Sequence, residues 1–216
     1  MATETKKAWA TREKRDRADS ATRAALLAAA RTVFERRGYA RTTVAGITAE
    51  AGVGRATFYV YFASKAEAFA VLAEQVRDRF LAGQDLSGVD AGDPYAVAEA
   101  TITAYLDAYL DNLAFITVLQ HQAITDPRMG ALWEEIHGRP RRRSARYTRR
   151  LAEEGTADPA ASPDAVARAA GGMVAGFATA LAADPRDRDR AAAELTAMYI
   201  RLLGLPDRPG QRKGRA

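Results

Sequence analysis

The chain has 216 residues, 48% hydrophobic and 27% charged, a composition typical of a globular protein. It contains no cysteine, which excludes a disulfide framework and any thiolate metal site. The net charge of +5 is concentrated in residues 1–81, which hold 15 Lys and Arg against 9 Asp and Glu, whereas residues 82–216 hold 17 against 18. A segment that meets a polyanion would show this asymmetry, and so would a solubilising basic surface.

Residues 1–19 are polar and basic, with Trp9 as the one large apolar residue, and they predict a flexible basic arm. Such an arm could enter a minor groove of DNA or act only as a solubilising tail. The segment lacks the apolar stretch of a signal peptide, and no later apolar run is long enough to span a bilayer. We therefore expect a soluble cytoplasmic protein without a membrane partner.

Helical periodicity begins at Ser20. The stretch SATRAALLAAARTVFERRG places apolar residues at three- and four-residue steps and ends at Gly38, which predicts an amphipathic helix. TVAGITAEAG predicts a short second helix that ends at Gly52, because glycine adopts a turn conformation that is costly for other residues.

The next stretch, RATFYVYF at residues 55–62, favours a strand by propensity but lies between two helical elements. On a helix, Phe58 and Phe62 share one face and can close a small core with Ile47. The opposite face and the flanks carry Ala56, Thr57, Tyr59, Val60 and Tyr61. A slim surface of this kind suits the major groove of DNA, and the order helix, glycine turn, short helix is that of a helix-turn-helix.

The rest of the chain predicts further helices. One is predicted over SKAEAFAVLAEQVRDRFLAG. Others are predicted to begin at the Asp-Pro or Ser-Pro pairs at 93–94, 126–127 and 162–163. Gly138 and Pro140 are expected to kink or break the helix that contains them. Apart from residues 55–62, which lie between two helical elements, no stretch favours a strand, so the sequence predicts an all-α protein of about nine helices.

The stretch TTVAGITAEAGVGRATFYVYFASKAEAF resembles the DNA-binding domain of TetR-family transcriptional regulators. The shared features are the threonine that opens the second helix, AGV at the turn, the T-F-Y-x-Y-F helix and the S-K pair that follows it. Two positions depart from the family pattern. Thr48 stands where alanine is common, and we expect its hydroxyl to bond a carbonyl one turn back. Gly54 stands where serine is frequent, so one possible phosphate contact is missing.

The resemblance implies how the domain would hold DNA. Thr43 and Lys65, at the N-termini of the second and fourth helices, would bind phosphate with help from the helix dipoles. Tyr59 and Tyr61 would hold the backbone, and Arg55 is the best candidate for reading a guanine. The complete predicted DNA-binding set is Thr43, Gly54, Arg55, Ala56, Thr57, Tyr59, Val60, Tyr61 and Lys65.

The resemblance also implies a dimer, a ligand-responsive C-terminal domain and, most often, repression at a palindromic operator. We expect a flexible arm over 1–19, a three-helix helix-turn-helix domain over 20–68, a helical ligand-binding and dimerisation domain over 69–205 and a disordered tail over 206–216. Four apolar residues of the fourth helix would couple the two domains, namely Phe69, Leu72, Val76 and Phe80.

Inward aromatic residues of the second domain predict a site for a small, mostly apolar effector, although a solid core could use them equally well. The predicted ligand-binding residues are Tyr105, Tyr109, Phe115, Leu119, Gln122, Trp133 and Phe177. The glycine-rich stretch AAGGMVAGFATA predicts a close helix approach, either within one subunit or across the family's four-helix dimer interface. The predicted interface residues are Gly172, Gly176, Leu195, Met198 and Leu202.

Weaker signals remain open. RPRRRSARYTRR, residues 139–150, is either a solvated helix face or an anion receptor near the ligand entrance. His121 and His137 are too few for a metal site, so we expect no metal and no cofactor. The chain has no nucleophile elbow or phosphate loop, and we do not expect an enzyme. The alternatives are an activator or ligand-independent regulator of the same fold, and an α-helical enzyme or lipid carrier.

Overall fold

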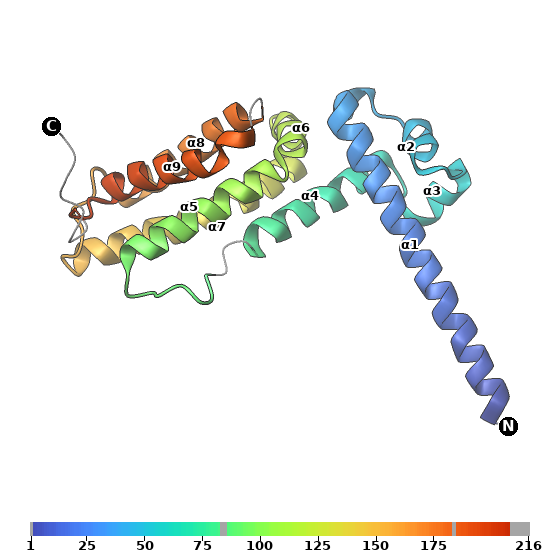
Figure 1. Ribbon diagram of the computed structural model, residues 1–216. Coiled ribbons are helices and arrows are strands. Elements are labelled where there is room, and N and C mark those ends of the chain that lie inside the picture. Colours follow the sequence, from blue (N-terminus) through green and yellow to red (C-terminus); the bar gives the residue numbers. More distant parts are fainter. Residues whose placement is uncertain (1, 83–85, 183–184, 208–216) are drawn as a thin grey trace.

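The computed structural model describes residues 2–82, 86–182 and 185–207, which form nine α-helices, one short 3₁₀ helix and no strand (Figure 1). The predicted all-α fold is therefore confirmed. The helices are α1 (Ala2–Arg41), α2 (Val44–Ala51), α3 (Arg55–Tyr61), α4 (Lys65–Ala82), α5 (Pro94–Leu110), α6 (Leu113–Ala123), α7 (Pro127–Glu153), α8 (Pro163–Leu181), η1 (Pro185–Asp187) and α9 (Arg188–Leu203).

The molecule has a small helical unit at one end and a helix bundle at the other (Figure 1). Helices α2 and α3 lie beside α1, and α4 leads from this unit to the bundle of α5, α7, α8 and α9. Helix α6 contacts α1, and α4 packs along α7, so one buried apolar cluster runs through both parts. Within the described part of the chain, no single helix is long and apolar enough to cross a membrane, and the α5–α6 pair that passes by length and composition is bent by 80°.

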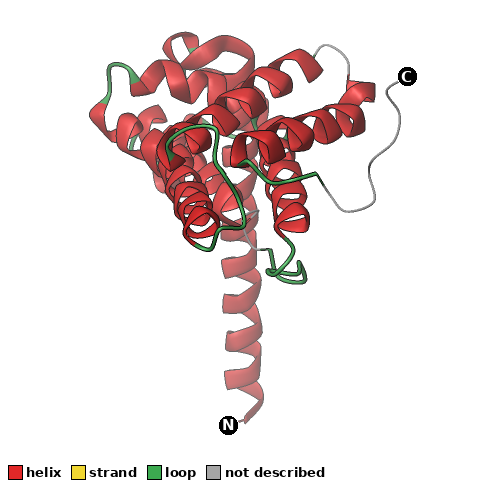
Figure 2. Ribbon diagram, turned by 90° about the vertical axis from the view of Figure 1, so that its left-hand side faces the viewer, coloured by secondary structure: helices red, strands yellow, loops and turns green. Residues whose placement is uncertain are grey.

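Helix α1 is longer than predicted. Its backbone is helical from Ala2 in place of the expected flexible arm over 1–19, and it projects well beyond the body of the protein (Figure 2). No proline or glycine occurs before Gly38, and the good helix formers Ala, Lys, Arg and Glu dominate the segment. The prediction that Gly38 ends the regular helix is confirmed by its φ of 70°.

The predicted helix starts are confirmed by their caps. A side-chain oxygen of Asp93 accepts a hydrogen bond from the Tyr95 N–H at 2.8 Å, and one of Asp126 accepts from the Arg128 N–H at 2.9 Å. The Ser162 hydroxyl accepts from the Ala165 N–H at 3.4 Å. Each cap satisfies a donor that the first turn leaves without a partner.

Helix α7 is continuous over Pro127–Glu153, so the break considered at Gly138 and Pro140 does not occur. A proline removes one backbone hydrogen bond, and packing against α4, α6 and α8 holds the helix together across it. The predicted boundary loop after α4 includes residues 83–85, which lie outside the described part. The predicted tail over 206–216 also lies outside it except for its first two residues.

Candidate DNA interface and ligand cavity

The turn between α2 and α3 is built on Gly52, which has φ 66° and ψ 29°. The Gly52 N–H and the Val53 N–H both donate to carbonyls of the last turn of α2. The Val53 N–H donates to the Thr48 carbonyl at 3.0 Å. Behind the turn, Ile47, Phe58 and Phe62 are almost fully buried, which confirms the predicted small core. The hydroxyl of Thr48 donates to the Ala45 carbonyl at 3.2 Å, also as predicted.

The outer surface of α3 is exposed and partly apolar. Val60 is 76% exposed and Tyr59 51%, and they are two of the three large hydrophobic side chains that are exposed in the described chain. Arg55 and Ala56 are exposed beside them, whereas Thr57 is half-buried. Arg55 makes no hydrogen bond or ion pair with any described residue. Exposed apolar groups next to a free guanidinium form a surface that suits a binding partner.

Cationic and donor groups surround the N-terminus of α2. The Thr43 hydroxyl accepts from the Gly46 N–H at 3.1 Å and is exposed. The guanidinium of Arg37 lies beside this first turn, because a Cβ built on Gly46 would be 3.4 Å from Arg37 Nη1. Arg37 and Arg41 were not among the predicted contacts, although both lie in the basic end of α1 that directly precedes this turn.

Two predicted DNA contacts have partners inside the protein. The ammonium of Lys65 donates to the carbonyls of Tyr39 at 2.9 Å and Thr42 at 2.8 Å, and it lies 4.6 Å from the centre of the Tyr39 ring. The hydroxyl of Tyr61 donates to Asp19 at 3.3 Å. Lys65 thus binds carbonyl oxygens at the end of α1, where a cation is favourable. In this conformation neither side chain is free to bind phosphate.

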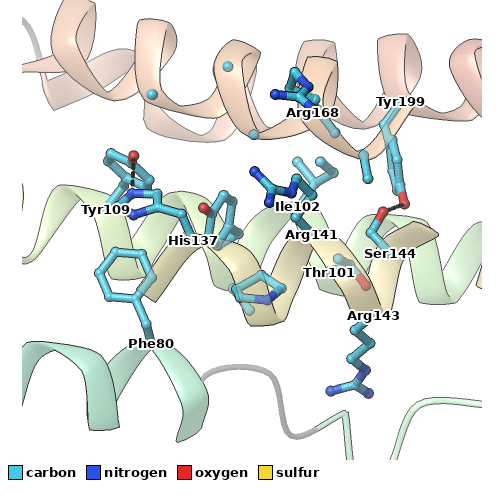
Figure 3. Close-up of a pocket in the computed structure, with 18 of the residues that line it drawn as sticks. Phe80, Thr101, Ile102, Tyr109, His137, Arg141, Arg143, Ser144, Arg168 and Tyr199 are labelled. Carbon is cyan, nitrogen blue, oxygen red and sulfur yellow. Dashed lines mark hydrogen bonds between the residues drawn. The ribbon is translucent and has the colours of Figure 1, made fainter. Parts of the chain in front are cut away.

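A cavity of about 890 Å³ lies in the bundle, chiefly between α5, α7 and α8 (Figure 3). Of the predicted ligand residues, Tyr105, Tyr109 and Trp133 line it. Phe115 and Leu119 are instead fully buried core residues, and the ring of Phe115 packs against Phe69 with centroids 5.0 Å apart.

The other two predicted ligand residues, Gln122 and Phe177, are half-buried and do not line the cavity. Phe177 packs against the core from α8. The prediction missed the hydrophilic side of the cavity, which includes His137, Ser144 and Tyr199 as well as several arginines. The hydroxyls of Ser144 and Tyr199 lie 2.7 Å apart.

Tyr109, Trp133 and His137 form a hydrogen-bonded aromatic group in the cavity wall. His137 Nδ1 donates to the Trp133 carbonyl at 2.9 Å, so Nε2 of the neutral ring accepts from the Tyr109 hydroxyl at 2.8 Å. The rings of Trp133 and His137 have centroids 3.9 Å apart. Burial raises the pKa of Tyr109 to about 12 and lowers the pKa of His137, which favours this uncharged arrangement.

Lowering the pH from about 8 to about 5 should destabilise the protein through His137. Because the folded-state pKa lies below the unfolded value of 6.5, the stabilising effect of the neutral ring is complete above pH 6.5 and is lost as the pH falls through the folded-state pKa. Urea unfolding at pH values across this range should therefore show that His137→Asn loses less stability than the wild type as the pH falls. His121→Asn, at an exposed position, is the matched control. Equal pH dependence in wild type and His137→Asn would contradict the assignment.

The predicted dimer residues divide between the surface and the interior. Gly172 and Gly176 are exposed, and a Cβ on either would find no heavy atom within 4 Å. The alternative that these two glycines allow a close helix approach within one subunit is therefore wrong. Gly172 also lines the cavity. Leu195 is fully buried in its own subunit, so its prediction as an interface residue is wrong. Met198 and Leu202 are half-buried.

Comparison with known proteins covers both parts of the molecule. Residues 26–72 match the family described as bacterial regulatory proteins, tetR family, and residues 93–203 match the tetracyclin repressor-like C-terminal domain. The chain is 33% identical over 90 residues to the uncharacterised HTH-type transcriptional regulator YfiR of Bacillus subtilis. That match spans 42% of this chain and 42% of the relative, less than half of each.

Solved structures share the fold at low identity. A bacterial regulatory protein of the tetR family from Rhodococcus RHA1 has a TM-score of 0.74 at 21% identity, over 86% of this chain and 98% of that one. SmeT, the repressor of the Stenotrophomonas maltophilia multidrug efflux pump SmeDEF, has a TM-score of 0.62 at 21% identity, over 90% and 96% of the two chains. With one family match on the helix-turn-helix part and another on the bundle, the chain belongs to the TetR family of bacterial transcriptional regulators, which bind DNA and are not enzymes.

Proposed function

We propose that this protein is a homodimeric repressor that binds a palindromic operator through α3 and releases it when a small molecule occupies the bundle cavity. The outer face of α3 carries this proposal. It presents exposed Val60 and Tyr59 beside Arg55, which has no partner among the described residues. A helix with this face can enter the major groove, where Val60 can contact a thymine methyl group and Arg55 can bind a guanine.

Around α3, the exposed groups near the N-terminus of α2 would hold the phosphates. Thr43 and the arginines Arg37 and Arg41 lie there, and the N–H groups of a helix N-terminus add to the attraction for anions. In a symmetric dimer the two α3 helices would read half-sites separated by one turn of DNA, about 34–36 Å, or a multiple of it.

Helix α4 would transmit the ligand signal, because its aromatic residues contact both parts. At one end Phe69 packs on Phe34 and Tyr39, with ring centroids 4.9 and 5.0 Å away. At the other end Phe80 lines the cavity and packs on Tyr109 at 5.5 Å. A ligand that moves Phe80 would favour an α4 position in which the spacing of the α3 helices no longer matches the operator.

The known relatives support this proposal. SmeT is named as the repressor of a multidrug efflux pump, and a SmeT–triclosan complex has also been solved. The same fold can therefore combine repression with binding of a small molecule. The alternative of an activator or a ligand-independent regulator uses the same DNA-binding surface, and no feature of the described residues favours it.

Binding to sheared genomic DNA at several salt concentrations tests the DNA-binding part of the proposal. Several phosphate contacts should make the affinity fall steeply with salt, by about a factor of 10³ or more between 50 and 200 mM for six or more contacts. Fragments selected from the source genome would then identify the operator. Absence of binding at low salt would refute the proposed function.

Arg55→Ala and Tyr59→Phe should affect DNA binding in different ways. Arg55→Ala removes a base contact and should cost roughly 1–3 kcal/mol on the operator while relaxing the preference at one base pair of each half-site. Tyr59→Phe removes a phosphate contact and should weaken binding to all sequences alike. Fluorescence anisotropy with operator and random duplexes would measure both effects. The matched control is Arg139→Gln, an exposed arginine of α7, and equal losses on both duplexes for both variants would contradict this division.

A further inference from the structure

The cavity wall carries several cationic side chains. Four arginines of α7 and one of α8 line it, whereas no aspartate or glutamate occurs among its described lining residues. The five are Arg141, Arg143, Arg146, Arg150 and Arg168. The sequence left open whether the arginine-rich run of α7 is a solvated face or an anion receptor. In the structure Arg143, Arg146 and Arg150 are exposed and Arg141 is half-buried, so the run is a solvated face that also borders the cavity.

Carboxylates pair with some of these arginines, and Arg150 lies 3.8 Å from Glu154. Glu134 accepts from Arg141 at 3.0 Å and lies 3.5 Å from Arg142, so it is shared between two guanidiniums. Arg168 makes no ion pair or hydrogen bond with any described residue, and it reaches the cavity from α8 on the side opposite Arg141. A guanidinium without a carboxylate partner at a cavity wall is ready to bind an anion.

Arg141 points from α7 into the space near Ile102, and Arg168 lies on α8 across that space (Figure 3). Arg141 also lies near the inner aromatic residues. Burial raises the pKa of Tyr105, and the positive charge of Arg141 opposes this rise. Burial lowers the pKa of His137, and the same charge lowers it further. Arg141 therefore lies where a charged group would meet the apolar end of the cavity, and the exposed Arg168 lines the cavity from α8.

The inner end is aromatic. Phe80 lies against Tyr105 and Tyr109, with ring centroids 5.8 and 5.5 Å away, and Trp133 completes this wall. Farther along α7, the buried hydroxyl of Tyr147 has no hydrogen-bond partner among the described residues, although its ring lines the cavity. Since burial raises the pKa of Tyr147, this hydroxyl remains protonated and can donate a hydrogen bond.

We propose that the effector is an organic monoanion, with a carboxylate held between Arg141 and Arg168 and an apolar body against the aromatic wall formed by Phe80, Tyr105 and Trp133. This assignment rests on the ligand-responsive role proposed above and replaces the mostly apolar molecule that the sequence predicted. A cavity of about 890 Å³ has room for a ligand of drug size.

The charges decide the ligand class. A carboxylate can form paired, charge-assisted hydrogen bonds with a guanidinium, which are stronger than those of a neutral hydroxyl. A neutral analogue of the same length would keep the apolar contacts but give Arg168 no counter-ion. A cationic analogue would be repelled by all five arginines. The expected order of affinity is carboxylate, then alcohol, then ammonium.

Trp133 provides a direct measurement of binding, because the chain has two tryptophans and Trp9→Phe leaves Trp133 as the only one. In this background, decanoate and decyltrimethylammonium would be titrated below their micelle concentrations, and decanol below its solubility limit, while Trp133 emission is recorded. Decanoate should bind at least about tenfold more tightly than decanol. Arg141→Gln and Arg168→Gln should each weaken decanoate binding about ten- to a hundredfold and leave decanol binding nearly unchanged.

Arg139→Gln is the matched control, since Arg139 is exposed on α7 and does not line the cavity. Equal binding of decanoate and decanol, or decanoate binding that neither arginine variant weakens, would overturn the proposed anion site. Operator release is measured separately by anisotropy. If decanoate binds with the predicted dependence on the arginines but does not release DNA, the anion site is supported and the proposed ligand-responsive function fails.

Discussion

Replacing Gly176 by leucine should make the protein monomeric and lower its operator affinity by about two orders of magnitude or more, because one half-site can no longer increase the effective concentration at the other. Gly176 is exposed on α8, and a Cβ there meets no heavy atom within 4 Å. The leucine therefore has room within its own subunit. A partner helix that approaches this glycine in the proposed dimer would be held apart by the new side chain.

Folding should not suffer, because leucine is a better helix former than glycine by roughly 0.5–1 kcal/mol. Sedimentation velocity would report the oligomeric state, and anisotropy with operator duplex would report the affinity. Ala131→Leu, which adds a leucine side chain at an exposed position of α7, is the matched control. A Gly176→Leu protein that remains dimeric at micromolar concentration would place the dimer interface elsewhere.

Gly204→Ala should destabilise the fold by about 4 kcal/mol or more, an exceptionally large effect for one methyl group. Gly204 ends α9 with φ 70°, a conformation that L-residues adopt only at a cost. The backbone of Asp158 also lies directly against it, because a Cβ on Gly204 would clash with the Asp158 carbonyl oxygen. The segment around Asp158 would have to move, and the 3.0 Å hydrogen bond from the Asp158 N–H to the Gly204 carbonyl would be lost.

Gly52→Ala is the matched control for this experiment. Gly52 has nearly the same φ, 66°, but a Cβ there finds no heavy atom within 4 Å. Only the backbone cost of about 1–2 kcal/mol should appear. Thermal unfolding would separate the two, with a drop in Tm of about 10 °C or more for Gly204→Ala and only a few degrees for Gly52→Ala. Similar drops would show that the close contact with Asp158 relaxes easily.

The DNA-binding half was largely predictable because its signals are local. Three features follow from residues that lie close together along the chain. They are the turn at Gly52, the burial of Phe58 with Phe62, and the hydrogen bond from the Thr48 hydroxyl to a carbonyl one turn back. The hydrogen bonds from Lys65 to the carbonyls of Tyr39 and Thr42 were not predictable. These residues lie more than 20 positions earlier and meet Lys65 only when α4 packs beside the end of α1.

The sequence by itself determined most of the helices, their caps and the surface of α3, because each depends on residues that are neighbours along the chain. The helical backbone of residues 2–19 and the continuity of α7 across Pro140 were not predicted. Only the tertiary structure decided which inward residues line a cavity and which fill a core. Phe115 and Tyr105 belong to similar apolar stripes, yet Phe115 packs against Phe69 while Tyr105 faces the cavity. Periodicity identifies the inward face of a helix but not what that face meets. For the same reason, only the arrangement of α7 and α8 brought Arg141 and Arg168 to one cavity and changed the expected ligand from an apolar molecule to an anion.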